Sequence, residues 1–380
     1  MNHRWAWVWR WVRLLLWLVV LAPLVALMTD LLSARRYQDP HWIRARVDRI
    51  DALRETVQLP VAFAEGSEAL PQVWVFGASS VAAPSREAFT EPLLEVLRGL
   101  EQPVVVHNFG VPGLTSWSVV QRVRDVREAA AGRQPDLVVL YTGHNDVTYT
   151  YHAALGTPGA NPWSYPFAGL VAGVAWTLAS ADEVDYADPG AFRWYRHRFV
   201  PPMLMRFQRA GLLRLRTEDF APLEVRVREA WADNVEQMLS PFVAAGVPVL
   251  LVTPVGALAW PPAGALDGAV ALYEAGMAEP DYAMRMRLLR AARDAELFTS
   301  DMRAKSSMLD HLRRRAPAAP ASGVAVALCD VEAAFDAREL PWDTSMFVDP
   351  LHFSTEGYAQ LTEVVGGCIA AMLRDGVVTD

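Results

Sequence analysis

The chain has 380 residues, 52% of them hydrophobic and 21% charged, so it can bury a sizeable core and is neither disordered nor collagen-like. Its formal net charge of −8 argues against nucleic acid as a principal partner. Lys305 is the only lysine, which excludes a Walker phosphate loop and the kinase lysine pattern. The length predicts one large domain with insertions, or two domains.

The N-terminal residues 1–36 are predicted to form a membrane anchor. Three arginines precede an apolar run that ends at Met28, and four tryptophans alternate with them as in an interfacial aromatic belt. Residues 5–28 approach the roughly 20 residues that a helix needs to cross a bilayer. No A-x-A pattern follows, which favours an uncleaved signal anchor over cleavage near Ala34. We expect a single-pass protein of the inner membrane with residues 37–380 on the extracytoplasmic, periplasmic side.

Beyond a charged helical connector at residues 37–70, strands and helices are predicted to alternate. Buried strands are predicted over residues 73–76, 104–106, 137–141, 247–253 and 324–328. Helices are predicted within residues 85–99 and over residues 116–131, 224–245 and 355–373. This alternation indicates an α/β fold, in which helices cover both faces of a parallel sheet and catalytic groups lie at the carboxyl ends of the strands.

Two segments interrupt the alternation. Residues 147–222 are rich in tryptophan, tyrosine, glycine and proline. Residues 255–320 contain a helical stretch that resembles one or two repeat-type hairpins, although no sequence repeat supports a solenoid. We therefore divide the chain into an anchor (1–36), a connector (37–70) and a catalytic domain (71–380) that carries both insertions.

Cys329 and Cys368 are the only cysteines, so a zinc ribbon, a zinc finger and a CxxC site are excluded. They form either one disulfide or two buried thiols, and we favour the thiols because their spacing carries no signal. The eight histidines are scattered without an HExxH motif, so neither a metal nor another cofactor is expected.

Three short motifs at predicted strand ends carry groups suited to acyl chemistry. Ser79 follows Gly77-Ala78 at the expected start of a helix, where N–H groups and the helix dipole favour a developing oxyanion. Gly113 lacks a side chain and can bring its N–H close to a reacting carbonyl. Asn145 can supply a further amide donor. Taken singly, each motif also fits an ordinary turn or helix cap.

The fourth motif is Asp349-Pro350-Leu351-His352, just before the last predicted helix. A carboxylate three residues before a histidine can accept a hydrogen bond from the ring and orient the imidazole as a base toward a serine. The alternative is that Ser354 or Thr355 caps the helix and that the histidine is incidental.

In this order the four motifs resemble the SGNH (GDSL-type) hydrolase family. The resemblance covers residues 73–373 apart from the insertions, and it is greatest to bacterial members with membrane anchors or tetratricopeptide-like helices. It implies a three-layer, flavodoxin-like fold and a serine esterase or acyltransferase without a cofactor. The implied roles are Ser79 as nucleophile, His352 as base, Asp349 as its orienter, and an oxyanion hole made by the N–H groups of Ser79 and Gly113 and the amide of Asn145.

Three positions depart from the family pattern. Ala78 replaces the usual aspartate, which would loosen the nucleophile loop or change a hydrogen bond in it. Ser80 follows Ser79 directly and leaves the register of the nucleophile open by one residue. His144 replaces the commoner glycine before Asn145, and we interpret it as loop variation rather than as a substrate contact.

We expect a membrane-tethered esterase or O-acyltransferase that acts on acyl esters, above all acetyl esters, of an envelope glycan or similar molecule. The aromatic side chains of residues 147–222 suit sugar stacking, although most are expected to form that segment's own core. The alternative is a catalytically idle, glycan-binding or scaffold subunit of an envelope polysaccharide-modifying complex, which Ala78 would favour. Because Ser79, Asp349 and His352 are all present, we favour the enzyme.

Overall fold

The computed structural model describes residues 61–64, 69–147, 221–262, 268–296, 303–316 and 326–374. Within this part of the chain, five parallel strands form one sheet in the order β2-β1-β3-β4-β5. This is a flavodoxin-like strand order. The strands are β1 (Gln72–Gly77), β2 (Val105–Asn108), β3 (Leu137–Tyr141), β4 (Val249–Val252) and β5 (Val326–Cys329).

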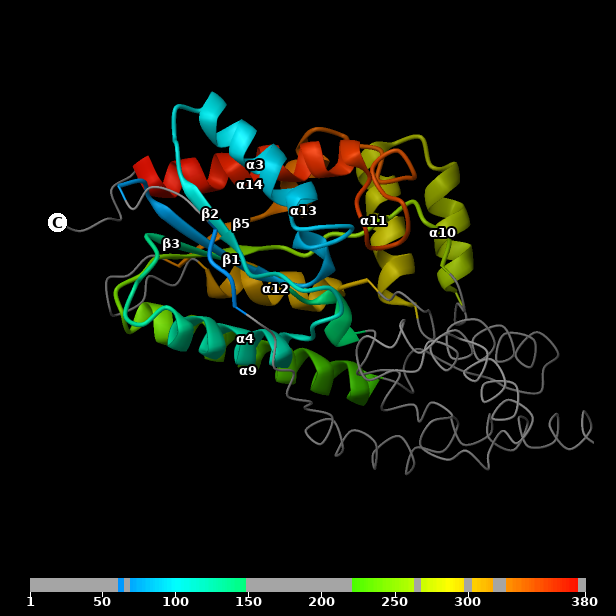
Figure 1. Ribbon diagram of the computed structural model, residues 1–380. Helices are drawn as coiled ribbons and strands as arrows, with labels where there is room; N and C mark the ends of the chain where they lie inside the picture. The colour runs from blue at the N-terminus through cyan, green and yellow to red at the C-terminus, as the bar shows by residue number, and fades with distance from the viewer. Residues whose placement is uncertain are drawn as a thin grey trace, which may run out of the picture.

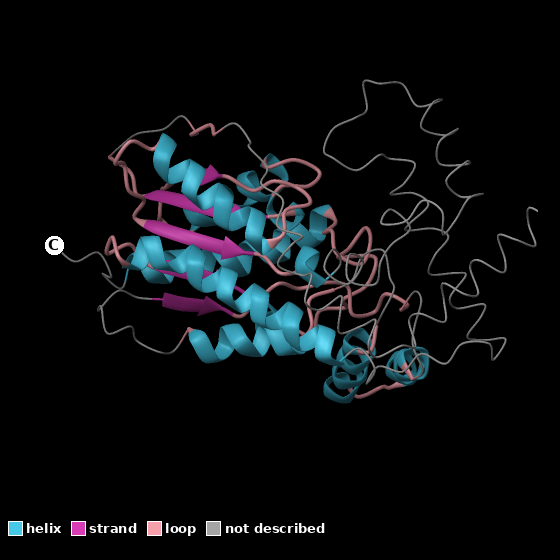
Figure 2. Ribbon diagram, turned by 90° about the horizontal axis from the view of Figure 1, so that it is seen from below, coloured by secondary structure: helices cyan, strands magenta, loops and turns pink. Residues whose placement is uncertain are grey.

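Helices cover both faces of the sheet, so the predicted three-layer α/β architecture is confirmed for the described residues (Figures 1 and 2). One face carries α3 (Glu87–Gly99), α13 (Val331–Ala337) and α14 (Thr355–Arg374). The opposite face carries α4 (Ser116–Ala129), α9 (Ala221–Val243) and α12 (Ser306–Arg315). A helical hairpin of α10 (Ala269–Ala278) and α11 (Tyr282–Asp294) lies beyond the carboxyl ends of the strands (Figure 1).

The strands form because their apolar side chains are buried on both faces of the sheet. Trp74 and Phe76 of β1 enter the apolar cluster beneath α4 and α9. Val73 and Val75, which point to the opposite face, enter the cluster beneath α3 and α14. Continuous apolar strands of this kind are typical of parallel sheets covered on both sides. The strands and helices predicted outside the insertions end within three residues of the observed ends, whereas α13 was not predicted.

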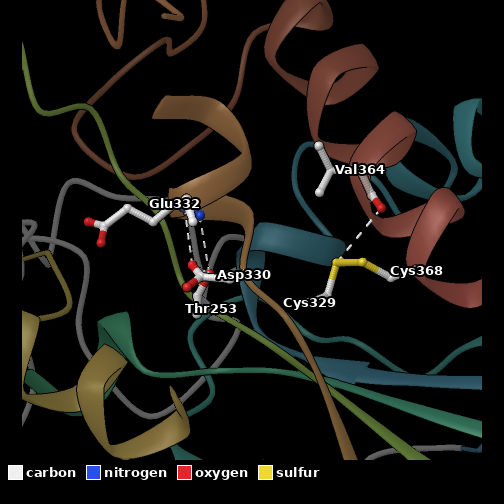
Figure 3. Close-up of a disulfide and its surroundings, with 7 residues drawn as sticks. Thr253, Cys329, Asp330, Glu332, Val364 and Cys368 are labelled. Atoms are coloured by element: carbon white, nitrogen blue, oxygen red, sulfur yellow. Dashed lines mark hydrogen bonds between the residues drawn. A yellow bond between two sulfur atoms is a disulfide. The ribbon is translucent and has the colours of Figure 1, made fainter. Parts of the chain in front are cut away.

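The two cysteines form a disulfide, so the expectation of two thiols is wrong. Cys329 at the end of β5 is bonded to Cys368 in α14, and their Cα atoms lie 5.9 Å apart (Figure 3). The Sγ atom of Cys329 also lies 3.7 Å from the carbonyl oxygen of Val364 in the same helix. The bond thus fastens α14 to the sheet. The sequence did not reveal it, because the two positions are 39 residues apart and meet only when α14 packs on β5.

Several sequence predictions concern other parts of the chain. The anchor at residues 1–36, most of the connector at residues 37–70 and residues 148–220 of the aromatic insertion lie outside the described residues. Among the helices that the structure does describe, none has the length and apolar character required to cross a bilayer.

Candidate active site

Ser79 lies in a short 3-10 turn, η2 (Ser79–Val81), directly after β1. The Val81 N–H donates to the Ala78 carbonyl at 3.2 Å, and the Ala82 N–H donates to the Ser79 carbonyl at 3.1 Å. Ser79 was predicted at the start of a helix, and the helix that starts there is this single 3-10 turn, since α3 begins only at Glu87. A long helix dipole therefore does not act on this serine, and its environment depends on the turn and on the loops around it.

The two neighbouring serines differ in their surroundings. Ser80 is buried, with 5% of its surface exposed. Ser79 is partly exposed. Ala78 is buried in the apolar cluster beneath α4, where a carboxylate in its place would lose its hydration.

The second and third motifs are in direct contact. Gly113 is exposed and has φ 83°, a left-handed conformation that glycine adopts without strain. Asn145 is buried, and its side-chain amide donates to the carbonyl of Leu114 at 2.9 Å. The asparagine that follows β3 is therefore tied to the residue after Gly113, as the clustering of groups at strand ends predicts.

A second polar network lies behind Asn145, and its residues were not predicted to serve the site. The carboxylate of Asp146 accepts from the Ser116 N–H at 3.0 and 3.1 Å and from the Ser116 hydroxyl at 2.5 Å. Asn234 of α9 donates to the same hydroxyl at 2.8 Å. Burial raises the pKa of Asp146 to about 6, although the hydrogen bonds from Ser116 oppose this. Asp146 directly follows Asn145 in the sequence, and this adjacency is the signal from which the network could have been predicted.

The fourth motif forms the histidine–carboxylate pair that it predicts. His352 Nδ1 lies 2.6 Å from Asp349 Oδ2, and Asp349 Oδ1 accepts from the N–H groups of Leu351 and His352, both at 2.8 Å. Burial opposes ionisation of Asp349, but the His352 ring and the two N–H groups outweigh it and hold the pKa of Asp349 below its usual value. When Nδ1–H is donated to the carboxylate, Nε2 is the ring nitrogen able to accept a proton.

Helix α14 holds this pair near the Ser79 turn. Tyr358, in its first turn, donates its hydroxyl to the carbonyl of Ala83 and lies 3.5 Å from the carbonyl oxygen of Ser79. A Cβ atom on Gly357 would lie 1.9 Å from the Met346 carbonyl oxygen, so glycine is needed where the helix meets the loop before Asp349. The start of α14 thus contacts both the serine turn and the loop of the histidine.

His144 is a buried residue and not simple loop variation. Its Nε2–H donates to the carbonyl of Val255 at 3.1 Å, and its Nδ1 accepts from the N–H of Ala304 at 3.0 Å. Burial, reinforced by the charges of His352 and two arginines, lowers the pKa of His144 to about 3 despite the bond to Val255. The ring is therefore neutral and occupied by main-chain groups.

The described residues contain no group of three histidine, cysteine or carboxylate side chains placed to hold a metal ion. The family model described as GDSL-like lipase/acylhydrolase matches residues 75–360, well over half of the chain. The chain belongs to this family and is an SGNH-type ester hydrolase.

Three solved structures illustrate the likeness. A lipase/acylhydrolase from Enterococcus faecalis is 15% identical, and the match covers 80% of this chain and 97% of that chain with a TM-score of 0.36. A GDSL-like lipase from Bacteroides thetaiotaomicron is 12% identical, with 87% of this chain and 98% of that chain covered and a TM-score of 0.38. An acetylxylan esterase from Geobacillus stearothermophilus is 12% identical, with 78% and 92% of the two chains covered and a TM-score of 0.35. None of the curated proteins matches the sequence significantly. The family assignment rests on the match over residues 75–360.

Proposed function

We propose that the protein is a serine esterase or O-acyltransferase with Ser79 as nucleophile, His352 as general base and Asp349 as its orienter. The observation that carries the proposal is the 2.6 Å contact between His352 Nδ1 and Asp349 Oδ2, in a loop held beside the Ser79 turn by α14. A carboxylate on Nδ1 fixes the tautomer in which Nε2 can take the serine proton.

In this mechanism, Ser79 Oγ adds to the ester carbonyl carbon while its proton passes to His352 Nε2. The carbonyl oxygen becomes an oxyanion, which the N–H groups of Ser79 and Gly113 and the Asn145 amide would stabilise. The bond from Asn145 to Leu114 uses one N–H of the amide and fixes the direction of the other. The alcohol then leaves with the proton from His352, and water or a sugar hydroxyl removes the acyl group from Ser79.

We further propose that the catalytic domain lies outside the cytoplasm, tethered by residues 5–28. The disulfide between Cys329 and Cys368 supports this placement, because disulfides persist in oxidising compartments. In such a place an envelope glycan is accessible, and the aromatic residues of the segment 147–222 suit sugar rings. We therefore propose acetyl esters of an envelope glycan as substrate, and proteins of envelope polysaccharide modification as partners.

A fluorophosphonate probe tests the nucleophile, with Ser80→Ala as the matched control for Ser79→Ala. We expect the probe to modify Ser79 in the purified protein, to label Ser80→Ala, and to leave Ser79→Ala unlabelled. Labelling at Ser80 would overturn the assignment of the nucleophile. A folded wild-type protein that takes no label would favour the idle glycan-binding or scaffold role.

A reporter enzyme that is active only after export tests the location. Fused after residue 380, it is expected to be active in cells that produce the full chain. Reporter activity found only in the cytoplasm would reject the proposed topology, and a mature N-terminus near residue 35 would reject the anchor.

A further inference from the structure

We propose that His144 is a positioning residue that fixes the loop of Asp349 and His352 relative to the Asn145 amide. The inference rests on the proposed function, since it concerns the distance between the base and the oxyanion donor of that site. His144 directly precedes Asn145, and its ring binds the main chain of two segments from the second insertion. Neither segment belongs to the four motifs.

The first contact leads from His144 toward the histidine–carboxylate loop. His144 Nε2–H donates to the Val255 carbonyl, and two residues later the Ala257 N–H donates to the carbonyl of Pro350 at 2.9 Å. Pro350 directly follows Asp349. A Cβ atom on Gly256 would lie 2.7 Å from the same Pro350 oxygen, so the two loops are packed as closely as their backbones allow.

The second contact links His144 to the segment of Arg303 and Ala304, which also contacts the loop at residues 255–257. His144 Nδ1 accepts from the Ala304 N–H, and the preceding residue, Arg303, donates to the carbonyl of Ala257. Arg303 is itself buried and paired with Glu296, with Nε and Oε2 3.1 Å apart. The loop at residues 255–257 is therefore held between the His144 ring, the guanidinium of Arg303 and the Pro350 carbonyl.

These contacts make His144 a bridge whose chemistry is specific. The ring must donate from one nitrogen and accept at the other, and both partners are main-chain groups. Glutamine can donate and accept in the same way, whereas leucine fills similar space and can do neither. Loss of the bridge would let the base loop shift relative to Asn145, and a displacement of about 1 Å at a catalytic group can cost about 100-fold in turnover.

His107 offers a matched control. It is 5% exposed, against 6% for His144, and both of its ring nitrogens are also engaged. Its Nδ1 accepts from the Ala64 N–H at 2.9 Å, and its Nε2 lies 2.7 Å from Gln72 Oε1. These partners belong to β1 and to the segment before it, and neither takes part in the contacts of His144. His107→Leu thus removes a buried, doubly bonded histidine without touching the bridge.

The experiment compares His144→Leu, His144→Gln and His107→Leu with the wild type in the full chain. Hydrolysis of p-nitrophenyl acetate is measured per active site, with sites counted by fluorophosphonate titration. We expect kcat per titrated site to fall about 10- to 100-fold in His144→Leu, with KM nearly unchanged, and to recover largely in His144→Gln. His107→Leu is expected to keep its kcat per site. Amide exchange should show faster exchange of the Ala257 and Ala304 N–H groups in His144→Leu.

A double mutant separates positioning from general destabilisation. When Asn145→Ala has removed the oxyanion donor, adding His144→Leu should cost less than it does in the wild type, since the geometry it protects is already lost. The positioning role would be overturned if His144→Leu kept the wild-type kcat per site, or if the effects of His144→Leu and Asn145→Ala multiplied independently. Either result would leave the proposed function standing. A folded wild type with neither labelling nor hydrolysis would overturn the proposed function and the inference with it. If His144→Leu does not fold, a His144→Gln variant with wild-type amide protection but a 100-fold lower kcat would also overturn the bridge.

Discussion

The candidate site and a second cluster of charged residues use polar groups in opposite ways. We call the second cluster the charged layer; it consists of Glu332, Arg290, Arg293 and Arg313. In the site, the His352 side chain is 29% exposed, and its Nδ1 lies 2.6 Å from the carboxylate of Asp349. In the charged layer, Glu332 at the start of α13 is 4% exposed and lies within 3.1 Å of three arginines. The first arrangement suits proton exchange by His352, whereas the second keeps Glu332 ionised down to low pH.

The charged layer joins the second insertion to the last strand and helices. Glu332 binds Arg290 and Arg293 of α11 and Arg313 of α12. Its N–H donates to the hydroxyl of Thr253, which follows β4 (Figure 3). Burial opposes ionisation of Glu332, but the arginines outweigh it and lower its pKa to about 2. The comparison teaches that substitutions in the site should change turnover, whereas substitutions in the layer should change stability.

The largest effect is expected at His352. His352→Ala should lower turnover on unactivated esters by about 10⁴-fold or more, because serine is a poor nucleophile without a base. Asp349→Asn should be less harmful, and the double mutant hardly worse than His352→Ala, since the two residues act as a unit. Steady-state kinetics on the three variants check this. Effects that multiply independently would show that Asp349 and His352 are not coupled.

In the charged layer, Glu332→Gln should lower the free energy of unfolding by about 3–5 kcal/mol, because it removes the charge that the buried Arg293 shares with the partly exposed Arg290 and Arg313. Glu363→Gln is the control: its side chain is 54% exposed, its Oε2 lies 2.9 Å from Arg338, and the expected cost is about 0–1 kcal/mol. Urea unfolding measures both. Turnover per titrated site should be unchanged in either variant, and a large fall in it would remove the distinction between the two regions.

The loss of stability in Glu332→Gln should also depend on pH. The folded-state pKa of Glu332 is lowered from 4.5 to about 2, so its stabilising contribution is complete above pH 4.5 and is lost as the pH falls toward 2. The difference in stability between the wild type and Glu332→Gln should therefore shrink on acidification across this window. A difference that stays constant from pH 5 to pH 2.5 would contradict the lowered pKa.

Asn145→Ala tests whether a substitution in the candidate site changes turnover more than stability. Turnover should fall about 100- to 1,000-fold, the usual cost of one oxyanion donor. The amide also bonds to the Leu114 carbonyl, so a loss of about 1 kcal/mol in stability is expected as well. Kinetics and urea unfolding of the same preparation separate the two effects. Turnover within a few-fold of the wild type would make Asn145 a turn residue.

The smallest expected effect is the contribution that titration of Lys305 makes to stability. Its amine donates to the carbonyls of Arg293, Asp294 and Glu296 at the end of α11. Burial lowers its pKa from 10.5 to about 8, although nearby carboxylates oppose this. Between these pH values the unfolded chain binds more protons, so this group makes stability rise with pH. Because the chain has no other lysine, isotopic labelling of lysine gives one side-chain NMR signal. A midpoint near 10.5 would contradict the burial of the amine.

Much of the fold could be predicted because it depends on local patterns. Short apolar runs marked the strands, and the order of Ser79, Gly113, Asn145 and the Asp349–His352 pair indicated the family. The structure brings Asn145 to the residue after Gly113, and His352 to Asp349. These contacts were predictable, because the carboxyl ends of parallel strands meet at one edge of a sheet and because the last pair is local in sequence.

The sequence by itself determined the alternation of strands and helices, the family and the residues expected to carry the chemistry. Only the tertiary structure decided which serine is accessible, that the cysteines are bonded, and that His144 connects two loops of the second insertion. Each of these depends on groups 39 to 160 residues apart, or on the burial of one neighbour and the exposure of the next. Such contacts arise when helices and loops pack on the sheet, so no local periodicity or spacing in the chain encodes them.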